Sequence, residues 1–434
     1  MMKRFSVLAV VILFTLPVFA QAPGELTFKE AVKIALRNNV NLNQQQNFLF
    51  QAEANKTTSI AQLGPQVSIT GNTFRNDGNS FNAQRGEVVN GVIDVFQGQI
   101  RAVMPVFNGL SGMNTARQAS NQRDAQTEFV RRTSQDVINI VSMQFLQVLL
   151  DQQLLLIAQE NKQLQEKQFE QVKAQVELGS RSPVDEYNQQ AQLKNADLQV
   201  LQAEFNLQND KATLSLTLQI DPAIEYRVLE PDWDVNEVSI DNSSMDELIP
   251  IALANRSDLR MAQFNETASR YGMNAQKGNY FPSINAFFNY GSAYNDIHGT
   301  PDSLSRDFSQ QFFSDNTSQQ FGLGFTIPIF RAFQNRSSYV GAKVAYQNNQ
   351  INTKNMEITV KNDVIRAYRN FHSIQLAYVS TQAQLEAAQM AFNLETDRFD
   401  LGITSFVEFA NANRTYIQSQ TDMAQARYRL LFNG

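Results

Sequence analysis

The chain has 434 residues, a formal net charge of −6 and no cysteine. The missing cysteine excludes disulfide scaffolds, thiolate metal sites, cysteine nucleophiles and an acylated N-terminal cysteine. The acidic balance argues against nucleic acid as a partner. Only two histidines occur, His298 and His372, and neither has a ligand residue at metal-binding spacing, so we expect no metal and no cofactor.

Residues 1–20 have the pattern of a signal peptide. Lys3 and Arg4 precede an apolar run from Phe5 to Leu16, and a small-residue cleavage site ends at Ala20. The sequence therefore predicts an exported protein. No later segment reaches the roughly 20 uninterrupted apolar residues of a transmembrane helix, so we expect no helical membrane span.

The remaining chain contains two copies of one pattern, which we assign to repeat 1 at 21–218 and repeat 2 at 244–434. Residues 219–243 form an irregular connector between them, in which Trp233 is expected to pack rather than to bind a ligand. An internal repeat of this kind has to be found before local motifs are interpreted. The matched landmarks are residues 35–38 and 252–255, Pro65 and Pro282, Pro105 and Pro328, and the pairs Leu178-Gly179 and Leu401-Gly402.

Each repeat is predicted to contain a helix, a strand pair, a long helix, a turn and a returning helix. The strand pairs are expected at about 66–107 and 283–330, and the prolines Pro65, Pro105, Pro282 and Pro328 mark the junctions between strands and helices. The length difference between the repeats falls in hydrophilic stretches near 76–98 and 291–319, which we interpret as loops.

The predicted strands alternate between apolar and polar residues. Ile284, Ala286, Phe288 and Tyr290 share one face after Pro282, and Phe321, Leu323, Phe325 and Ile327 do so before Pro328. This pattern fits membrane barrel strands with one face on lipid and one on a water-filled lumen. Four strands cannot close a barrel, so we expect a homo-oligomer; two chains, three chains or more all remain compatible, and the alternative is a soluble two-sheet domain with covered edges.

Two long helices are predicted at about 112–178 and 338–400. The first contains no proline and no glycine after its opening residues, and apolar residues recur at helical spacing through Val137, Val141, Phe145, Leu149, Ile157 and Leu164. The second repeats the stripe with Ile358, Val364, Tyr368, Phe371, Leu385 and Phe392. Helices of this length persist by packing sideways on one another, as in coiled coils, and a bundle of them below a barrel makes a tube.

Both long helices end in a matched turn. Gly179 and Gly402 stop the helices, and Ser182 and Ser405 stand three residues before Asp185 and Glu408. That spacing predicts N-terminal capping boxes, with Pro183 at the first helical position of the earlier one. The alternative role of the two acids is electrostatic, because a ring of identical subunits would gather them at one opening.

The doubled pattern of a Pro-hydrophobic-Phe junction and a Leu-Gly-x-x-Ser/Thr turn followed by an acid resembles the TolC family of outer-membrane efflux proteins. The resemblance covers essentially the whole mature chain. It implies a homotrimer with a twelve-strand barrel in outer-membrane lipid, four strands per chain, continued by a long periplasmic α-helical coiled-coil barrel. It also implies a passive exit duct for efflux or type I secretion, whose tip docks on a periplasmic adaptor protein of an inner-membrane pump.

The resemblance further implies roles for individual residues. The tip turns that receive the adaptor correspond to Leu178, Gly179, Ser182, Leu401, Gly402 and Ser405, and the periplasmic aperture to Asp185 and Glu408. The chain departs from the family where a second acid is common, at Asn411, and where an arginine stands in the later turn, at Thr404. Arg181 lies in the earlier turn instead, so we include Arg181 and Asn411 in the predicted aperture.

Two other functions compete with the duct. A structural coiled-coil or adhesive envelope protein explains the long helices but not the paired amphipathic strands. A periplasmic adaptor needs lipoyl-like and small barrel modules, for which no pattern is present. No phosphate-binding glycine loop and no serine or cysteine with a histidine base occurs, so we expect no enzyme.

Overall fold

The computed structural model describes residues 24–82, 86–221, 223–233, 244–298 and 306–433. The predicted signal peptide and part of the predicted connector lie outside these residues. The chain divides into two compact units. Unit 1 contains 1–39, 136–241 and 369–434, and unit 2 contains 40–135 and 242–368, so each unit draws on both repeats.

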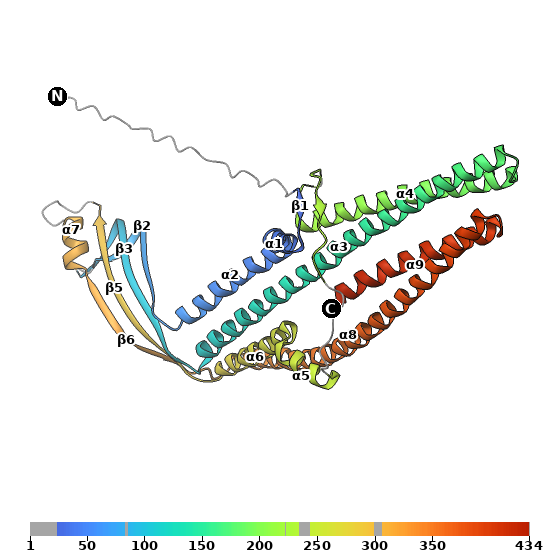
Figure 1. The fold of residues 1–434 in the computed structure, drawn as a ribbon. Coiled ribbons are helices and arrows are strands. Elements are labelled where there is room, and N and C mark those ends of the chain that lie inside the picture. The colour runs from blue at the N-terminus through green and yellow to red at the C-terminus, as the bar shows by residue number, and fades with distance from the viewer. Residues whose placement is uncertain (1–23, 83–85, 222, 234–243, 299–305, 434) are drawn as a thin grey trace, which may run out of the picture. The chain divides into compact units, whose positions relative to one another are not determined.

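Unit 2 contains a four-stranded antiparallel sheet in the order β2-β3-β5-β6 (Figure 1). The strands are β2 (Gln66–Asn82), β3 (Glu87–Asn108), β5 (Ser283–Ile297) and β6 (Ser318–Thr326). The two hairpins are joined through β3 and β5, where Ile100 pairs with Tyr290. Each repeat thus supplies one hairpin to a single sheet.

The hydrophilic stretch expected as a loop at 76–98 is largely strand, and the stretch at 291–319 begins as the end of β5, which corrects that interpretation. β2 and β3 remain paired as far as Asn82 and Glu87, and β5 continues to Ile297. Backbone pairing does not require an apolar face, so hydrophilic residues do not by themselves end a hairpin. A short helix α7 (Phe308–Gln310) and a π-helical turn η2 (Gln311–Asp315), neither expected from the sequence, precede β6.

The register places the alternating apolar residues on one face, as predicted. Phe288 pairs with Ala102 on β3 and with Phe321 on β6, so the apolar positions of neighbouring strands lie opposite one another. Phe321, Leu323 and Phe325 are 80%, 69% and 76% exposed in the single chain. Glycines and polar residues such as Gln320 occupy the other face.

The predicted junction prolines lie at or near strand ends. Pro65 and Pro282 directly precede β2 and β5, and Pro328 follows β6. Pro105 lies inside β3 at an irregularity in the pairing with β5, where a residue without an N–H is tolerated. Beyond it the chain passes Gly109, at which a Cβ would lie 2.3 Å from the carbonyl oxygen of Gly278. Only glycine permits this close crossing of the two repeats.

Helices flank the sheet connections in unit 2. The ion pairs of Arg256 with Asp258 and with Asp363, at 2.6 and 3.0 Å, link α6 to α8. The helices that lie wholly in this unit besides α7 are α2 (Val40–Ala61), α5 (Met245–Asn255) and α6 (Ser257–Gly278).

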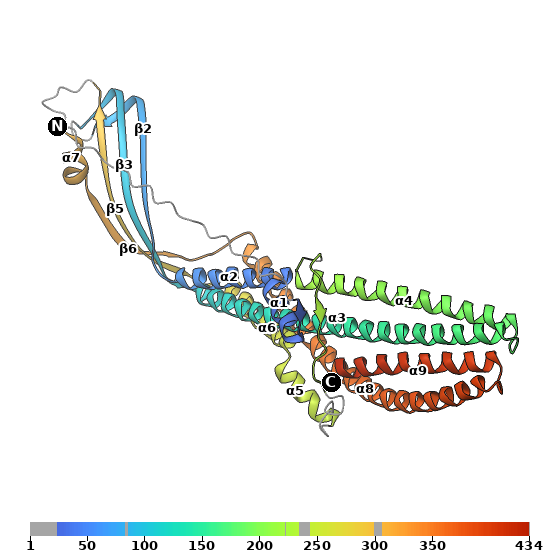
Figure 2. The ribbon, with the colours of Figure 1, turned by 45° about the horizontal axis from the view of Figure 1, so that its top comes forward.

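Unit 1 is built mainly from two helical hairpins that lie side by side (Figures 1 and 2). Two small elements accompany them: helix α1, and the strand β1, which pairs in parallel with β4. Phe28 of α1 packs edge-to-face on Trp233, which is therefore a packing residue as expected. The elements are β1 (Glu25–Leu26), α1 (Phe28–Asn38), α3 (Ser111–Glu177), α4 (Pro183–Leu218), β4 (Arg227–Val228), α8 (Gln334–Asp400) and α9 (Phe406–Asn433), with α3 and α8 starting in unit 2.

The predicted helical stripes are correct for α3 and partly wrong for α8. Val141 and Phe145 are fully buried in α3. In α8, Phe371 and Phe392 are buried, but Ile358 is 59% exposed while Val360 is fully buried. Ile358 and Val360 are both β-branched apolar residues, so the sequence alone does not show which of the two faces the core. In the structure the buried residue is Val360.

One described helix, α3, contains an 18-residue window that is long and apolar enough to cross a membrane, with mean hydropathy 1.5. This measure is an average over the window and does not require an uninterrupted apolar run, so it does not contradict the expectation from the sequence. The finding is weak support for a span, because 39% of the window is buried and core helices of soluble proteins pass the same test.

Candidate functional site

The first tip turn ends α3 by the glycine stop that the sequence predicts. Gly179 adopts φ 75°, a left-handed conformation that favours glycine. The N–H of Ser180 donates to the carbonyl of Gln175 at 2.9 Å, and that of Gly179 to Val176 at 2.9 Å, which is the Schellman arrangement. Ser182 then caps α4 by accepting from the N–H of Val184 at 3.2 Å, with Pro183 as the first helical residue.

The second tip turn has the same helix stop. Gly402 adopts φ 73°, and the N–H of Ile403 donates to the carbonyl of Arg398 at 2.8 Å. The two turns are therefore equivalent in backbone geometry although they come from different repeats. They differ at the start of the returning helix.

At that start, Glu408 completes a capping box, whereas Asp185 does not. The Glu408 carboxylate accepts from the N–H of Ser405 at 3.1 Å and from the Thr404 hydroxyl at 2.6 Å, and the Glu408 N–H donates to the Ser405 hydroxyl at 3.3 Å. Among the hydrogen bonds and ion pairs recorded for the described residues, the Asp185 carboxylate has none. The capping interpretation is thus confirmed for Glu408 and wrong for Asp185.

These contacts shift the ionisation of Glu408. The hydrogen bond from Thr404 lowers the pKa of the Glu408 carboxyl most, followed by those from the backbone and side chain of Ser405. All three stabilise the carboxylate form. Glu408 is therefore a charged helix cap at neutral pH.

The two tip regions are connected through Arg181. Its guanidinium lies 3.9 Å from the centroid of the Phe399 ring, and Nη2 donates to the Phe399 carbonyl at 2.7 Å. Gln171 adds a 3.0 Å hydrogen bond to the Asp400 carboxylate. Sequence reasoning singled out Arg181 for its unusual turn but missed Phe399 as its partner, since no local pattern links residues so distant in the chain.

A small aromatic core lies behind this connection. Phe399 stacks on Phe409 with ring centroids 4.7 Å apart, and Phe392 stacks on Tyr416 at 5.2 Å. Val172 of α3 belongs to the same buried cluster. The end of α8 is therefore a packed platform on which Arg181 rests.

The remaining predicted tip residues are exposed. Leu178 and Leu401, the residues before the two glycines, are 84% and 74% exposed, and Val184 and Val407 are 63% and 64% exposed. Asn411 is also exposed. Matched exposed apolar residues at both turns form a surface suited to protein contact.

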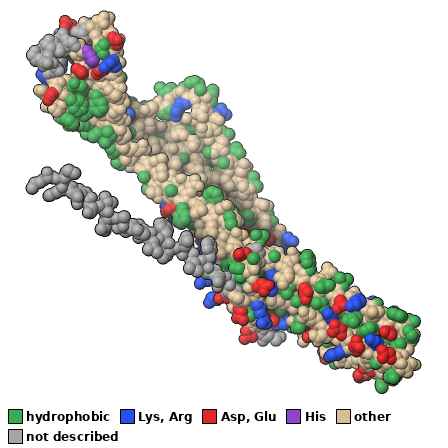
Figure 3. Space-filling view, turned by 90° about the horizontal axis from the view of Figure 1, so that it is seen from above, with side chains coloured by type: hydrophobic (Ala, Val, Ile, Leu, Met, Phe, Trp, Pro, Cys, Tyr) green, Lys and Arg blue, Asp and Glu red, His purple; other side chains and the backbone are tan. Residues whose placement is uncertain are grey.

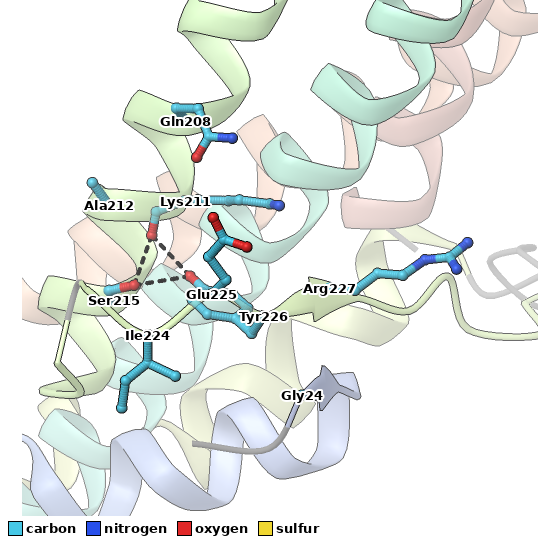
Figure 4. Close-up of a pocket in the computed structure, with 9 residues that line it drawn as sticks. All are labelled: Gly24, Gln208, Lys211, Ala212, Ser215, Ile224, Glu225, Tyr226 and Arg227. Carbon is cyan, nitrogen blue, oxygen red and sulfur yellow. Dashed lines mark hydrogen bonds between the residues drawn. The ribbon is translucent and has the colours of Figure 1, made fainter. Parts of the chain in front are cut away.

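Two other groups of side chains lie close together outside the tip turns. A cavity of about 440 Å³ adjoins α4 (Figure 4), where the Tyr226 hydroxyl donates to the Lys211 carbonyl at 2.8 Å and lies 3.0 Å from the Ser215 hydroxyl. These bonds fix the connector to α4, and burial raises the pKa of Tyr226. They are the contacts of a structural tyrosine.

The second group consists of Asp94, Asp296 and His298 in the sheet unit, whose ligand atoms lie within 4.8 Å of one another. His298 was expected to have no ligand partner, yet its Nε2 lies 2.9 Å from Asp94. Both Asp94 oxygens already accept from Arg75, at 2.7 and 2.6 Å, so we assign this group to ion pairing.

Known proteins share the sequence and the fold. The pattern of the family described as "Outer membrane efflux protein" matches residues 31–218 and 248–433. The outer membrane protein TolC of Vibrio cholerae is 23% identical over 86% of this chain and 80% of its own length. The outer membrane protein VceC of Vibrio cholerae superimposes with a TM-score of 0.80 at 12% identity, covering 94% of each chain.

The CmeC outer membrane channel of Campylobacter jejuni has a TM-score of 0.79 at 17% identity and covers 94% of this chain and 83% of its own. Such channels are trimers, in which each chain contributes four strands to the barrel. The fold is thus that of an outer-membrane barrel continued by a periplasmic helical barrel. The family match extends over most of the chain, and the chain therefore belongs to the outer membrane efflux protein family, as a passive channel subunit of the cell outer membrane and not an enzyme.

Proposed function

We propose that the chain is the exit duct of a tripartite efflux system, working as a homotrimer whose two tip turns dock on a periplasmic adaptor of an inner-membrane pump. The observation that carries the proposal is the equivalence of the turns at Gly179 and Gly402. Both present an exposed leucine beside the same left-handed glycine. In a trimer these turns make six alternating contact points at one end.

Asp185 is the acid that lines the aperture in this proposal. Its carboxylate is not engaged in a cap, so three copies in a ring present free carboxylates to the opening and attract cations. Glu408 is held in its capping box and serves the turn. Asn411 places a neutral side chain where a second acid is possible, which leaves Asp185 as the acid that faces the opening in this proposal.

Arg181 holds the aperture shut by keeping the first turn against Phe399. A guanidinium over an aromatic ring with an additional charge-assisted hydrogen bond is worth about 1–2 kcal/mol. Opening the tip separates α4 from α8 and breaks both contacts. In this proposal Arg181 therefore stabilises the closed tip through contacts within each chain.

Single-channel conductance in planar bilayers tests this function, with the purified trimer compared with Asp185→Asn and Glu408→Gln variants. We expect a small, cation-selective conductance whose selectivity falls in Asp185→Asn and persists in Glu408→Gln, since Gln still accepts capping hydrogen bonds. Folded trimer without stable conductance would contradict the duct. Equal selectivity in all three proteins would remove Asp185 from the aperture.

A further inference from the structure

The short helix before β6 covers an open edge of the sheet. β5 and β6 pair only as far as Gly291 with Ser318, so the strand edge from Ser292 onward has no strand partner among the described residues. An open edge is not tolerated in hydrocarbon because its backbone groups lack partners. Within the described chain, something other than a strand satisfies them.

Side chains of the helical segment do so. The Gln311 amide accepts from the N–H of Asn295 and donates to its carbonyl, both at 3.2 Å, as a paired strand would. The Asn316 amide donates to the Ala293 carbonyl at 2.7 Å, and the Ser292 hydroxyl donates to the Phe312 carbonyl. Gln311 is 6% exposed. Segment 308–316 is therefore fixed to β5 and is not a loose loop.

The segment lies on the apolar face of the sheet. Phe312 rests over Gly98, at which a Cβ would lie 2.8 Å from the ring. Phe96 lies 5.3 Å from Phe312, and Tyr294 lies 5.2 Å from Phe308, measured between ring centroids. Phe96 and Tyr294 are paired across β3 and β5 and continue the row that includes Ile100, Tyr290 and Phe288. The aromatic group thus extends the face that carries the exposed apolar residues of β6.

Charged residues begin immediately beyond these rings. Asp94 and Asp296 are the next paired residues on the same face, about 7 Å further along the strands, and Arg75 and His298 contact Asp94. Figure 3 shows acidic, basic and histidine side chains gathered beside a hydrophobic patch in this unit. The order apolar, aromatic, charged is that of a membrane–water boundary.

The strand length agrees with this position. A tilted barrel strand crosses the hydrocarbon in about 9–11 residues. On β3, the number of residues from Phe96 to the pairing irregularity at Pro105 falls in this range. The aromatic row and Pro105 therefore mark the two edges of the apolar band.

We propose that segment 308–316 is a lipid anchor, which places Phe308, Phe312 and Phe313 at the outer water–lipid boundary on the outside of the barrel. The segment contacts the interfacial layer of the outer leaflet, where headgroups meet acyl chains. Phe313 is 70% exposed and its ring contacts among the described residues are with Phe308 and Phe312, so it is the residue that enters the lipid. The inference rests on the outer-membrane position of the barrel.

Spin labels test the depth of the anchor, and the absence of cysteine allows single sites without background. Labels at Phe313→Cys, Leu323→Cys and Asp77→Cys are compared in the trimer reconstituted in phosphatidylethanolamine–phosphatidylglycerol vesicles. Collisions with oxygen report lipid and those with a water-soluble nickel chelate report water. We expect an oxygen-to-nickel ratio at 313 between the lipid value at 323 and the water value at 77.

The alternatives give different results. A ratio at 313 equal to that at 77 would overturn the anchor, since the helix would lie in water. Low collision rates with both reagents at 313 would also overturn it, because a neighbouring copy would then cover the segment. A water value at 323 would overturn the barrel placement itself, which separates failure of the outer-membrane assignment from failure of the anchor.

A second variant tests the seat of the helix on the sheet. Gly98→Ala forces Phe312 away, whereas Gly324→Ala has no atom within 4 Å of the new Cβ and serves as the matched control. We expect the nickel collision rate at 313 to rise with Gly98→Ala and to stay unchanged with Gly324→Ala. In Gly98→Ala combined with Phe312→Ala, the rate should return to the value measured without these substitutions. An unchanged value with Gly98→Ala would contradict the seating of Phe312.

Discussion

The two helical hairpins of unit 1 begin with helices of equal length, α3 and α8, and have equivalent helix stops, but their interiors differ. The α3–α4 hairpin buries polar side chains, and Gln189, which is fully buried, donates to the Gln165 side chain at 2.8 Å. The α8–α9 hairpin buries Phe392, Phe399 and Phe409 at the corresponding end. Polar contacts in a helix bundle fix register, while aromatic contacts supply stability. The division suits a duct in which one hairpin is held firmly and the other is attached to it by a breakable contact.

The largest expected effect comes from removing the aromatic platform. Phe399→Ala should destabilise the end of the α8–α9 hairpin by about 3–4 kcal/mol, since Phe399 is 4% exposed and large-to-small core changes cost this much. Leu401→Ala, two residues further along the chain and 74% exposed, is the control. Hydrogen exchange of the α8 and α9 amides in the detergent-solubilised trimer measures the loss. Equal exchange in both variants would show that the platform is not a core.

A buried acid of the α3–α4 hairpin gives the next largest effect. Burial raises the pKa of Asp151 to about 7, with a further contribution from the neighbouring Asp210 carboxyl, while Gln147 opposes the shift through a 3.1 Å hydrogen bond. A raised carboxyl pKa means that stability is highest at low pH and falls as pH rises from about 4 to about 7. Asp151→Asn should remove this slope and stabilise the protein above pH 7 by on the order of 1–2 kcal/mol.

Asp197 in the same hairpin is the matched control with the opposite sign. Lys194 and Lys162 lower its pKa, so its contribution is present above the ordinary carboxyl pKa and is lost as pH falls through the lowered value. Thermal unfolding of Asp151→Asn and Asp197→Asn across pH separates the slopes. A slope that survives Asp151→Asn would place its origin elsewhere.

The connection between the hairpins is the next target. Arg181→Lys keeps the charge but loses the planar stacking on Phe399 and should raise the fraction of open channel by about fivefold, consistent with roughly 1 kcal/mol. Arg398→Lys, in an exposed pair with Glu395 on the same helix end, should have no effect. Conductance recordings measure the open fraction. A change in both variants would indicate a general effect of replacing arginine by lysine and not a specific role of the Arg181–Phe399 contact.

Much of this arrangement followed from the sequence because it depends on local periodicity. The strand faces have a period of two residues, the repeats are marked by matched landmarks, and Gly179 and Gly402 stop their helices as the turn pattern predicts. The Arg181–Phe399 contact did not follow, since it joins positions 218 residues apart through packing. The helix at Phe308–Gln310 was missed because three residues give no periodicity. Its position on the sheet depends on the space that Gly98 leaves for Phe312, which the sequence does not show.

The smallest expected effect distinguishes the two acids of the tip turns. Glu408→Ala should lower the local stability at the start of α9, because it removes a capping box, whereas Asp185→Ala should leave the start of α4 unchanged. The Glu408 contribution is present above its ordinary pKa of 4.5 and is lost as pH falls through the lowered value. Hydrogen exchange of the first-turn amides at neutral and at acidic pH measures both variants. If Asp185→Ala also releases its helix, that acid is a cap after all, and the charge assigned to the aperture has to be carried by another residue.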